Sequence, residues 1–177
     1  MKRLSVGLIA LIGLAYILIL MGFRINLTDS IPVGLYRMIH EGELKNAYVI
    51  FCPDSRQAFR LGLDRGYIDH GLNCGGYGYL MKKVVAIPGD IVSVTKAGVL
   101  VNQVLIPFSK PKLKDGFNRP LPQWRVTHYQ LAEDELLTMT NQSEWSFDGR
   151  YYGLVHSSQI KGMLRPLWVI KKTGEKS

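Results

Sequence analysis

The hydrophobic pattern of the chain begins with an unbroken apolar segment. Residues 4–23 contain no charged side chain and follow a short positive start at residues 1–3. A helix of twenty residues is ~30 Å long at ~1.5 Å per residue, which matches the hydrocarbon core of a bilayer. The segment is longer than the apolar part of a usual signal peptide, and no small-residue cleavage pattern follows it. We therefore expect a cytoplasmic start at residues 1–3 and an uncleaved transmembrane anchor over residues 4–23.

After residue 23 the pattern changes to short apolar runs that alternate with turn residues. Such runs cover residues 35–39, 47–52, 79–87, 91–95, 99–101, 136–140 and 160–170. A short helix is expected over residues 57–63, and the proline-rich residues 106–124 indicate a surface excursion. Many short strands with little helix predict an all-β domain of antiparallel sheets over residues 24–177. The expected fold class is therefore mainly β, with one N-terminal transmembrane helix.

The strand expected over residues 79–87 carries two lysines in its middle and ends at the turn Pro88-Gly89. Successive strand residues point to opposite faces, so Lys82 and Lys83 lie on different faces. Whichever face is buried, one of the two starts from apolar surroundings, where burial lowers the pKa of a lysine. A lysine that is neutral near pH 7 can act as a general base. The alternative is that both stems cover apolar neighbours and place their ammonium groups in water.

A stiff segment follows the expected anchor and contains Ser30. Pro32 restricts its own φ and the conformation of Ile31, and Gly34 permits a turn. Ser30 therefore lies on extended backbone, a few residues from the expected membrane surface. The alternative is an ordinary serine in a turn, bonded to its own backbone.

The chain is basic, with 22 Lys and Arg against 14 Asp and Glu and a formal net charge of +8. No basic run, zinc-finger spacing or helix-turn-helix pattern accompanies this charge, so no nucleic-acid partner is expected. A domain held against anionic lipid headgroups explains the charge equally well. The two cysteines, Cys52 and Cys74, are too few for a disulfide scaffold and lack metal-site spacing. If the domain lies outside the cytoplasm, a single disulfide is favoured over two free thiols.

Three stretches occur in order along the chain and together carry a resemblance to a known family. They are residues 30–36 (Ser-Ile-Pro-Val-Gly-Leu-Tyr), residues 80–90 (Leu-Met-Lys-Lys-Val-Val-Ala-Ile-Pro-Gly-Asp) and residues 146–153 (Ser-Phe-Asp-Gly-Arg-Tyr-Tyr-Gly). Together with the expected anchor, they make the chain similar to the type I signal peptidases, which are serine peptidases with a Ser-Lys dyad. The proline two positions after the serine, and the stretches 65–67 and 74–76, resemble the conjugative-transfer, TraF-type branch of that family.

The resemblance assigns roles to five residues. It implies that Ser30 is the nucleophile, that Lys82 is the general base and that the Ser146 hydroxyl orients the lysine. Asp148 and Arg150 match the acid and the basic partner of the third motif. We interpret them as a structural pair that positions the loop of Ser146, because a lysine base has less need of an orienting acid than a histidine has. A glycine stands between them where the family usually has a serine, which puts only the local geometry in doubt.

Two donors are candidates for binding the tetrahedral oxyanion, namely the backbone N–H of Ser30 and the hydroxyl of Thr28. The chemistry implies no cofactor and no metal. The family cleaves after small residues, so shallow pockets are expected. The candidates for their lining are Ile31, Val33 and Val84.

The branch also implies a substrate and a location. The expected substrate is the precursor of a conjugative pilin-type subunit, with small residues before the cleavage site, and some members of the branch also join the pilin ends into a ring. The expected surroundings are lipid of the bacterial inner membrane, crossed once, a periplasmic catalytic domain, and other proteins of a conjugation or secretion apparatus. Two alternatives stay open, namely a general secretory signal peptidase and a non-catalytic membrane-anchored subunit of such an apparatus.

Overall fold

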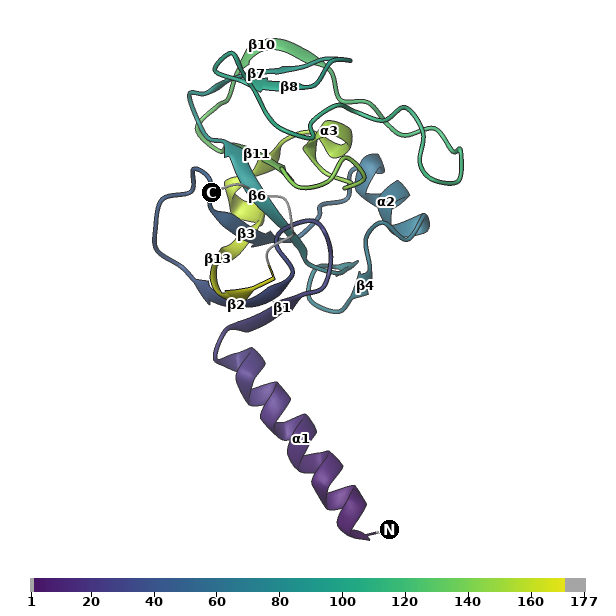
Figure 1. Cartoon of the computed structure of the whole chain (residues 1–177), viewed down its shortest axis with the longest axis vertical. Coiled ribbons are helices and arrows are strands. Elements are labelled where there is room, and N and C mark those ends of the chain that lie inside the picture. Colours follow the sequence, from purple (N-terminus) through teal and green to yellow (C-terminus); the bar gives the residue numbers. More distant parts are fainter. Residues whose placement is uncertain (1, 171–177) are drawn as a thin grey trace.

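The computed structural model of the protein describes residues 2–170, so Met1 of the expected cytoplasmic start and residues 171–177 of the expected domain lie outside it. Its main element is a seven-stranded sheet (Figure 1). In spatial order the strands are β1 (Phe23–Asn26), β2 (Gly34–Ile39), β13 (Ile160–Val169), β3 (Tyr48–Phe51), β6 (Leu80–Ala86), β11 (Glu135–Met139) and β12 (Val155–His156). Every neighbouring pair in this sheet is antiparallel. The expected mainly β fold of antiparallel sheets is confirmed.

Two smaller sheets and short helices accompany the main sheet. The smaller sheets contain β7 (Ile91–Val94), β8 (Val99–Val101), β9 (Val104–Leu105) and β10 (Val126–Gln130), and β4 (His70–Gly71) with β5 (Gly76–Tyr77). The short helices are α2 (Gln57–Asp64), α3 (Gly149–Tyr152) and a 3-10 turn (Ser157–Gln159). The expected helix is present as α2, and the apolar runs at 91–95 and 99–101 form β7 and β8, which pair as a hairpin. Strand β10 was not expected, because its side chains are mostly exposed and carry no apolar alternation.

The last strand, β13, packs against the first motif at Gly34. Strands β2 and β3 were both expected, but they do not pair with each other, because β13 lies between them. At the start of β2, a Cβ atom on Gly34 would lie 2.2 Å from the carbonyl oxygen of Trp168 in β13. Gly34 is therefore required by the close approach of β13 rather than by a turn.

The structure does not bear out the transmembrane anchor expected over residues 4–23. Helix α1 covers Lys2–Leu20, the chain turns at Gly22 with a φ of 86°, and the next residue opens β1. Because β1 pairs with β2, the last residues of the apolar segment are not part of the helix. Within the part of the chain that the structure describes, no helix is long and apolar enough to cross a membrane.

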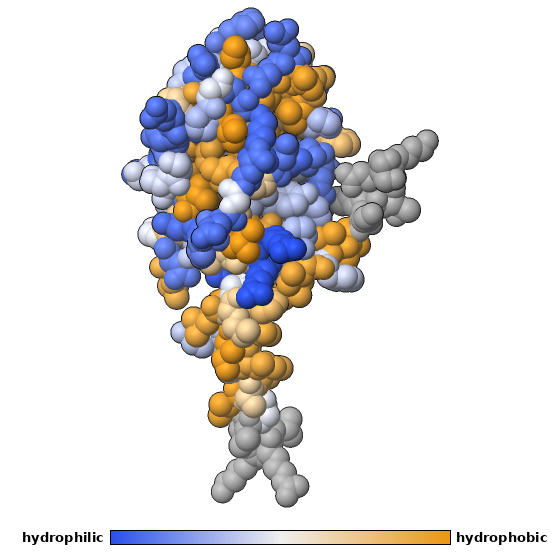
Figure 2. Space-filling model, turned by 90° about the vertical axis from the view of Figure 1, so that its left-hand side faces the viewer, coloured by the Kyte–Doolittle hydropathy of each residue, from blue (hydrophilic) through white to orange (hydrophobic). Residues whose placement is uncertain are grey.

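Helix α1 projects from the domain and carries exposed apolar side chains (Figures 1 and 2). Ile9, Leu11 and Tyr16 are each more than half exposed, at 69%, 64% and 62%. The domain therefore leaves an apolar helical surface uncovered.

Strand β6 lies between β3 and β11 and belongs to two apolar clusters. Leu80 and Val84 pack in a cluster that includes Phe51, while Val85 and Ala86 pack in a second cluster around the β7–β8 hairpin. Lys82 alternates with Leu80 and Val84, so it shares their face. The alternation of the central motif therefore places Lys82 toward the interior.

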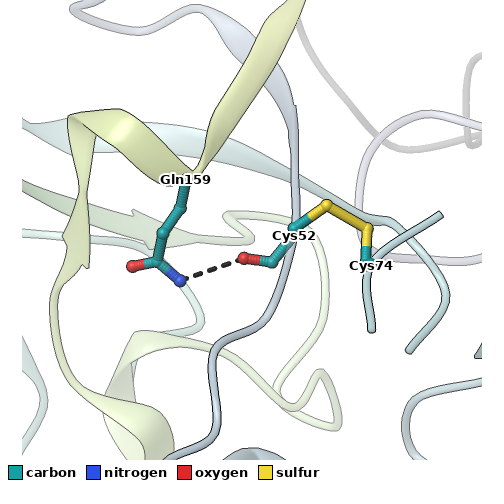
Figure 3. Close-up of a disulfide and its surroundings, with 3 residues drawn as sticks. All are labelled: Cys52, Cys74 and Gln159. Carbon is teal, nitrogen blue, oxygen red and sulfur yellow. Dashed lines mark hydrogen bonds between the residues drawn. A yellow bond between two sulfur atoms is a disulfide. The ribbon is translucent and has the colours of Figure 1, made fainter. Parts of the chain in front are cut away.

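A disulfide joins the end of β3 to the loop before β6. Cys52 and Cys74 are bonded, and Gln159 donates its side-chain N–H to the carbonyl oxygen of Cys52 at 3.0 Å (Figure 3). The disulfide that was favoured over two free thiols is thus present in the structure. It closes a loop that contains Tyr67 and Ile68, which line the cleft described below.

Removing this disulfide is expected to destabilise the domain. The two cysteines are 22 positions apart in sequence. The double variant Cys52→Ala/Cys74→Ala should therefore lose about 3 kcal/mol of unfolding free energy, because the unfolded chain gains the freedom of an open loop. Urea unfolding without reductant measures the difference. Wild type treated with reductant is the control and should match the variant. Equal midpoints for the oxidised wild type and the variant would contradict the prediction.

Candidate active site

A buried asparagine organises the segment that carries Ser30. Asn26, at the end of β1, is 4% exposed. Its side-chain N–H groups donate to the carbonyl oxygens of Thr28 at 2.7 Å and of Ile31 at 2.8 Å, and its Oδ1 accepts from the Thr28 hydroxyl at 2.9 Å. One amide thus holds the loop on both sides of Ser30. Sequence reasoning missed Asn26, since a single asparagine after an apolar segment belongs to no motif.

Two further hydrogen bonds tie the serine loop to neighbouring strands. The Thr140 hydroxyl, just after β11, donates to the carbonyl oxygen of Asp29 at 3.3 Å. The Tyr36 hydroxyl in β2 donates to the carbonyl oxygen of Pro32, and burial raises the pKa of Tyr36 above its usual value. The backbone around Ser30 is therefore held from β1, β2 and β11 together.

The lysine that faces the interior has a lowered pKa. Lys82 is 3% exposed, and burial lowers its pKa to about 8. The negative charge of Asp148 acts against this shift, and the positive charge of Arg150 adds to it. Lys83, on the other face of β6, is only partly buried. Lys82 therefore faces the interior, and its neutral form is accessible near pH 8.

The structure brings together the three side chains that the resemblance selected. Lys82 Nζ lies 2.6 Å from Ser30 Oγ and 2.8 Å from Ser146 Oγ. As an ammonium group, Lys82 donates to both hydroxyls. As a neutral amine, it donates one N–H to Ser146 and offers its lone pair to the Ser30 hydroxyl proton. This is the geometry that a general base needs toward a serine nucleophile.

The hydrogen bond from Lys82 to Ser146 is expected to matter for turnover. Ser146→Ala should lower kcat about tenfold to hundredfold, because a hydrogen bond to a charged group is worth about 1.5–3 kcal/mol. Cleavage of a leader peptide by purified protein measures the change. Ser146→Thr keeps the hydroxyl and should recover most of the activity, and Ser143→Ala, in the same loop, should stay near wild type. Equal losses in Ser146→Thr and Ser146→Ala would refute the orienting role.

Asp148 and Arg150 form a fully buried ion pair, and both are 0% exposed. Arg150 Nε donates to Asp148 Oδ1 at 2.8 Å, and Arg150 Nη2 donates to Oδ2 at 2.9 Å. The same guanidinium donates to the carbonyl oxygen of Ser146 at 3.0 Å. The pair therefore holds the backbone of Ser146 directly, which fits the structural role expected for it.

The glycine inside the third motif has a packing reason. Gly149 opens α3, and a Cβ atom there would lie 2.5 Å from Leu137 Cδ1 and 2.9 Å from the carbonyl oxygen of Thr138. The helix is capped by Asp148, whose side chain accepts from the backbone N–H of Arg150. The replacement of the family's usual serine thus lets α3 pack closely on β11, and the ion pair is kept.

The two expected oxyanion donors, the backbone N–H of Ser30 and the hydroxyl of Thr28, contact each other. The backbone N–H of Ser30 points at Thr28 Oγ1 over 3.4 Å, and the Thr28 hydroxyl donates to Asn26. Thr28 is exposed at the edge of the cleft. Its hydroxyl has to turn from Asn26 toward a bound oxyanion, so the donor role of Thr28 stays a prediction.

A cleft of about 520 Å³ opens over Ser30 and Lys82. Its apolar lining includes Leu27, Ile68 and Met81. The guessed pocket residues were wrong. Ile31 and Val84 are 0% exposed in the core, and Val33 is not among the lining residues. Core packing therefore removes Ile31 and Val84 from the cleft, although Val84 shares a face of β6 with Lys82.

No metal site accompanies this cleft. Between residues 2 and 170, no group of three or more His, Cys, Asp and Glu is arranged to hold a metal ion.

The chain is similar to several known proteins. The chain matches the family described as signal peptidase, peptidase S26, over residues 2–168. Two Escherichia coli proteins, each named plasmid transfer protein TraF, are 43% identical over 172 residues, covering 94% of this chain and 96% of the relative, and 44% identical over 166 residues, covering 94% of both. A crystal structure of a signal peptidase I from Enterococcus faecalis aligns with a TM-score of 0.40 at 15% identity, covering 71% of this chain and 98% of that one.

Proposed function

Because the chain belongs to the signal peptidase, peptidase S26, family, we propose that it is a serine endopeptidase that removes the leader from a conjugative pilin-type precursor. The resemblance to type I signal peptidases and to their TraF-type branch, seen in the three motifs, is confirmed by the matches. The observation that carries the proposal is the contact of 2.6 Å between Lys82 Nζ and Ser30 Oγ, at a lysine whose pKa burial lowers to about 8.

In the proposed acylation step, Lys82 removes the proton of the Ser30 hydroxyl, and Oγ attacks the carbonyl carbon of the scissile bond. The tetrahedral oxyanion that forms is bound by the N–H of Ser30 and the hydroxyl of Thr28. When the C–N bond breaks, the protonated Lys82 gives its proton to the leaving amine. The leader remains as an ester on Ser30 if it lies on the acyl side of the bond.

Deacylation uses the same base a second time. Lys82, again neutral, takes a proton from an attacking water, the ester bond to Ser30 Oγ breaks, and the proton passes from Lys82 to the serine oxygen. An amine that replaces water would give an amide instead, which is the chemistry needed to close a pilin into a ring. Ring closure requires that the retained part of the precursor, and not the leader, is the acyl group on Ser30.

The proposed substrate follows from the relatives. The TraF relatives are named as plasmid transfer proteins, which favours a conjugative precursor over the many substrates of a general secretory signal peptidase. We expect small residues before the cleavage site and contacts with other proteins of the conjugation apparatus, as in the family. Tethering enzyme and precursor at one membrane raises their effective concentration.

The location is part of the proposal. We place the protein at the bacterial inner membrane, with the exposed apolar surface of α1 in contact with lipid and the catalytic domain in the periplasm. The disulfide between Cys52 and Cys74 supports an oxidising compartment. Carbonate extraction of membranes and protease accessibility in spheroplasts test the two parts of this placement separately.

The experiment that tests the function is a processing assay in cells. The chain is co-expressed with a conjugative pilin precursor, and the pilin is analysed by mass spectrometry. Loss of the leader supports the proposal, and a product that is one water lighter than the linear pilin identifies ring closure. A precursor that stays intact, while the protein is folded and reaches the membrane, contradicts the proposal and favours the non-catalytic subunit.

The lowered pKa predicts how activity depends on pH. Only neutral Lys82 can accept the serine proton, and its pKa is about 8. kcat/KM should therefore rise about tenfold per pH unit below this pKa and level off above it. Initial rates on a leader peptide across the range measure the profile. A flat profile between about pH 6 and 9 would be incompatible with lysine as the base.

A further inference from the structure

Two arginines face each other on neighbouring strands at the base of the domain. Arg37 of β2 is directly opposite Arg165 of β13, and both are exposed. Residues directly opposite on antiparallel strands point to the same face, with Cβ atoms about 4.5–5.5 Å apart. The two guanidinium groups therefore project from one face of the sheet, side by side.

This placement costs stability unless an anion is present. Like charges directly opposite on a sheet destabilise it. Among residues 2–170, neither Arg37 nor Arg165 forms a hydrogen bond or an ion pair with a carboxylate. A guanidinium presents a planar fork of donors that fits phosphate oxygens. The pair therefore has the chemistry of a phosphate-binding site.

The two arginines also line one surface hollow. The hollow has a volume of about 670 Å³ and is lined by Arg37, His40 and Arg165, together with apolar side chains such as Leu167. Glu41 is the one carboxylate in this lining. The hollow is thus large enough for a lipid headgroup, and it carries more positive than negative charge.

An apolar row runs beside the arginine pair on the same face. Ile25 of β1 is opposite Leu35 of β2, and Leu35 is opposite Trp168 of β13. Ile25 and Trp168 are 67% and 64% exposed. Tryptophan is enriched where a protein meets the membrane–water interface. An apolar row beside paired arginines is the pattern of a surface that meets lipid headgroups and the upper acyl chains together.

The face lies where helix α1 meets the domain. In Figure 1, β1 and β2 cross the base of the domain directly above α1. In Figure 2, strongly hydrophilic residues lie at the base of the domain, just above the apolar helix. A lipid surface in contact with α1 would therefore be within reach of this face.

We propose that the basal face, defined by Ile25, Arg37, Arg165 and Trp168, binds anionic phospholipid. Arg37 and Arg165 hold one headgroup phosphate between them, and Ile25 and Trp168 lie against the glycerol and upper acyl region. The bound lipid neutralises the repulsion between the arginines and fixes the domain relative to the bilayer. The inference rests on the membrane location proposed above and adds a specific site to it.

The test measures lipid binding to the full chain in micelles of a neutral detergent. Phosphatidylglycerol and phosphatidylcholine are titrated, and retained lipid is counted by native mass spectrometry. Wild type should retain phosphatidylglycerol in preference to phosphatidylcholine. The variant Arg37→Gln/Arg165→Gln should bind phosphatidylglycerol about 30-fold more weakly. Each arginine near an anionic surface contributes about 1 kcal/mol of binding free energy, and about 2 kcal/mol for the pair corresponds to about 30-fold in affinity. The control Lys96→Gln/Lys110→Gln removes the same charge from two other exposed positions and should bind like wild type.

Two outcomes would overturn the proposal. Equal losses in the arginine and lysine variants would mean that net charge alone attracts the lipid. Inorganic phosphate that displaces phosphatidylglycerol at equal concentration would mean that the site binds free anions and not lipid. Without lipid, the arginine variant should unfold at the same or a higher temperature than wild type, because the repulsion is gone. The readout needs no turnover, so it fails or succeeds independently of the peptidase proposal.

Discussion

Replacing Lys82 by methionine should leave the precursor uncleaved, with kcat/KM lowered about 10³-fold, because a positioned general base contributes about 10²–10⁴-fold. Methionine fills a similar volume without a charge, so the buried position stays packed. Removing a buried ammonium group also removes the cost of its desolvation. The variant should therefore fold at least as stably as wild type, and the loss of activity should not come from unfolding.

The chain supplies its own control at the next residue. Lys83→Met removes the same charge from the other face of β6, where the side chain is partly exposed, and should leave processing near wild type. Ser30→Ala should lose activity at least as fully as Lys82→Met. The double variant should be no slower than Ser30→Ala alone, because residues that act as one unit are not additive. The assay is the mass of the pilin in co-expressing cells, together with rates on a leader peptide.

The pattern of losses separates the open alternatives. Normal processing in both Ser30→Ala and Lys82→Met would refute the dyad and favour a non-catalytic subunit. A loss in Lys83→Met as large as in Lys82→Met would point to the charge of the strand and not to a base. Cleavage of many unrelated secretory precursors by wild type would favour the general signal peptidase over the conjugative branch.

Asp148→Asn is expected to have the largest effect on stability. Asp148 and Arg150 are both 0% exposed, and the variant leaves the guanidinium buried without its carboxylate. Breaking a buried pair by removing one partner costs about 3–5 kcal/mol. Urea unfolding of the purified chain measures this. The control Asp54→Asn breaks the ion pair of Asp54 and Arg56, whose side chains are 34% and 38% exposed. This change should lower the free energy of unfolding by less than about 1 kcal/mol.

The same variant should also change the pH profile of the enzyme that remains folded. The negative charge of Asp148 raises the pKa of Lys82 against the larger effect of burial. Without that charge, the pKa of Lys82 falls further, and the rise in activity moves to lower pH. A variant with unchanged turnover, unchanged stability and unchanged reactivity of Lys82 would rule out the supporting role of Asp148.

Several parts of the candidate site could be predicted from sequence because they lie within short motifs. The spacing of Ser30, Lys82 and Ser146 matched a known family, and strand alternation required that one of Lys82 and Lys83 face the interior. Asn26 could not be predicted, since its hydrogen bonds depend on where the loop after β1 places the carbonyl oxygens of Thr28 and Ile31. The lining of the cleft was also misjudged, because core packing buries Ile31 and Val84 although they lie close in sequence to Ser30 and Lys82.

The sequence by itself determined the elements whose physical cause is local. Alternating apolar runs and turn residues were sufficient for the main strands, but not for β1, β10 or the strands of two residues. The motif was sufficient to select the serine and the lysine. Only the tertiary structure decided that β13 inserts between β2 and β3 and that β1 ends helix α1 early. It also decided that Lys82 Nζ lies at hydrogen-bond distance from Ser30 Oγ. These features depend on contacts between residues far apart in the chain, and no local pattern carries the energy of such contacts.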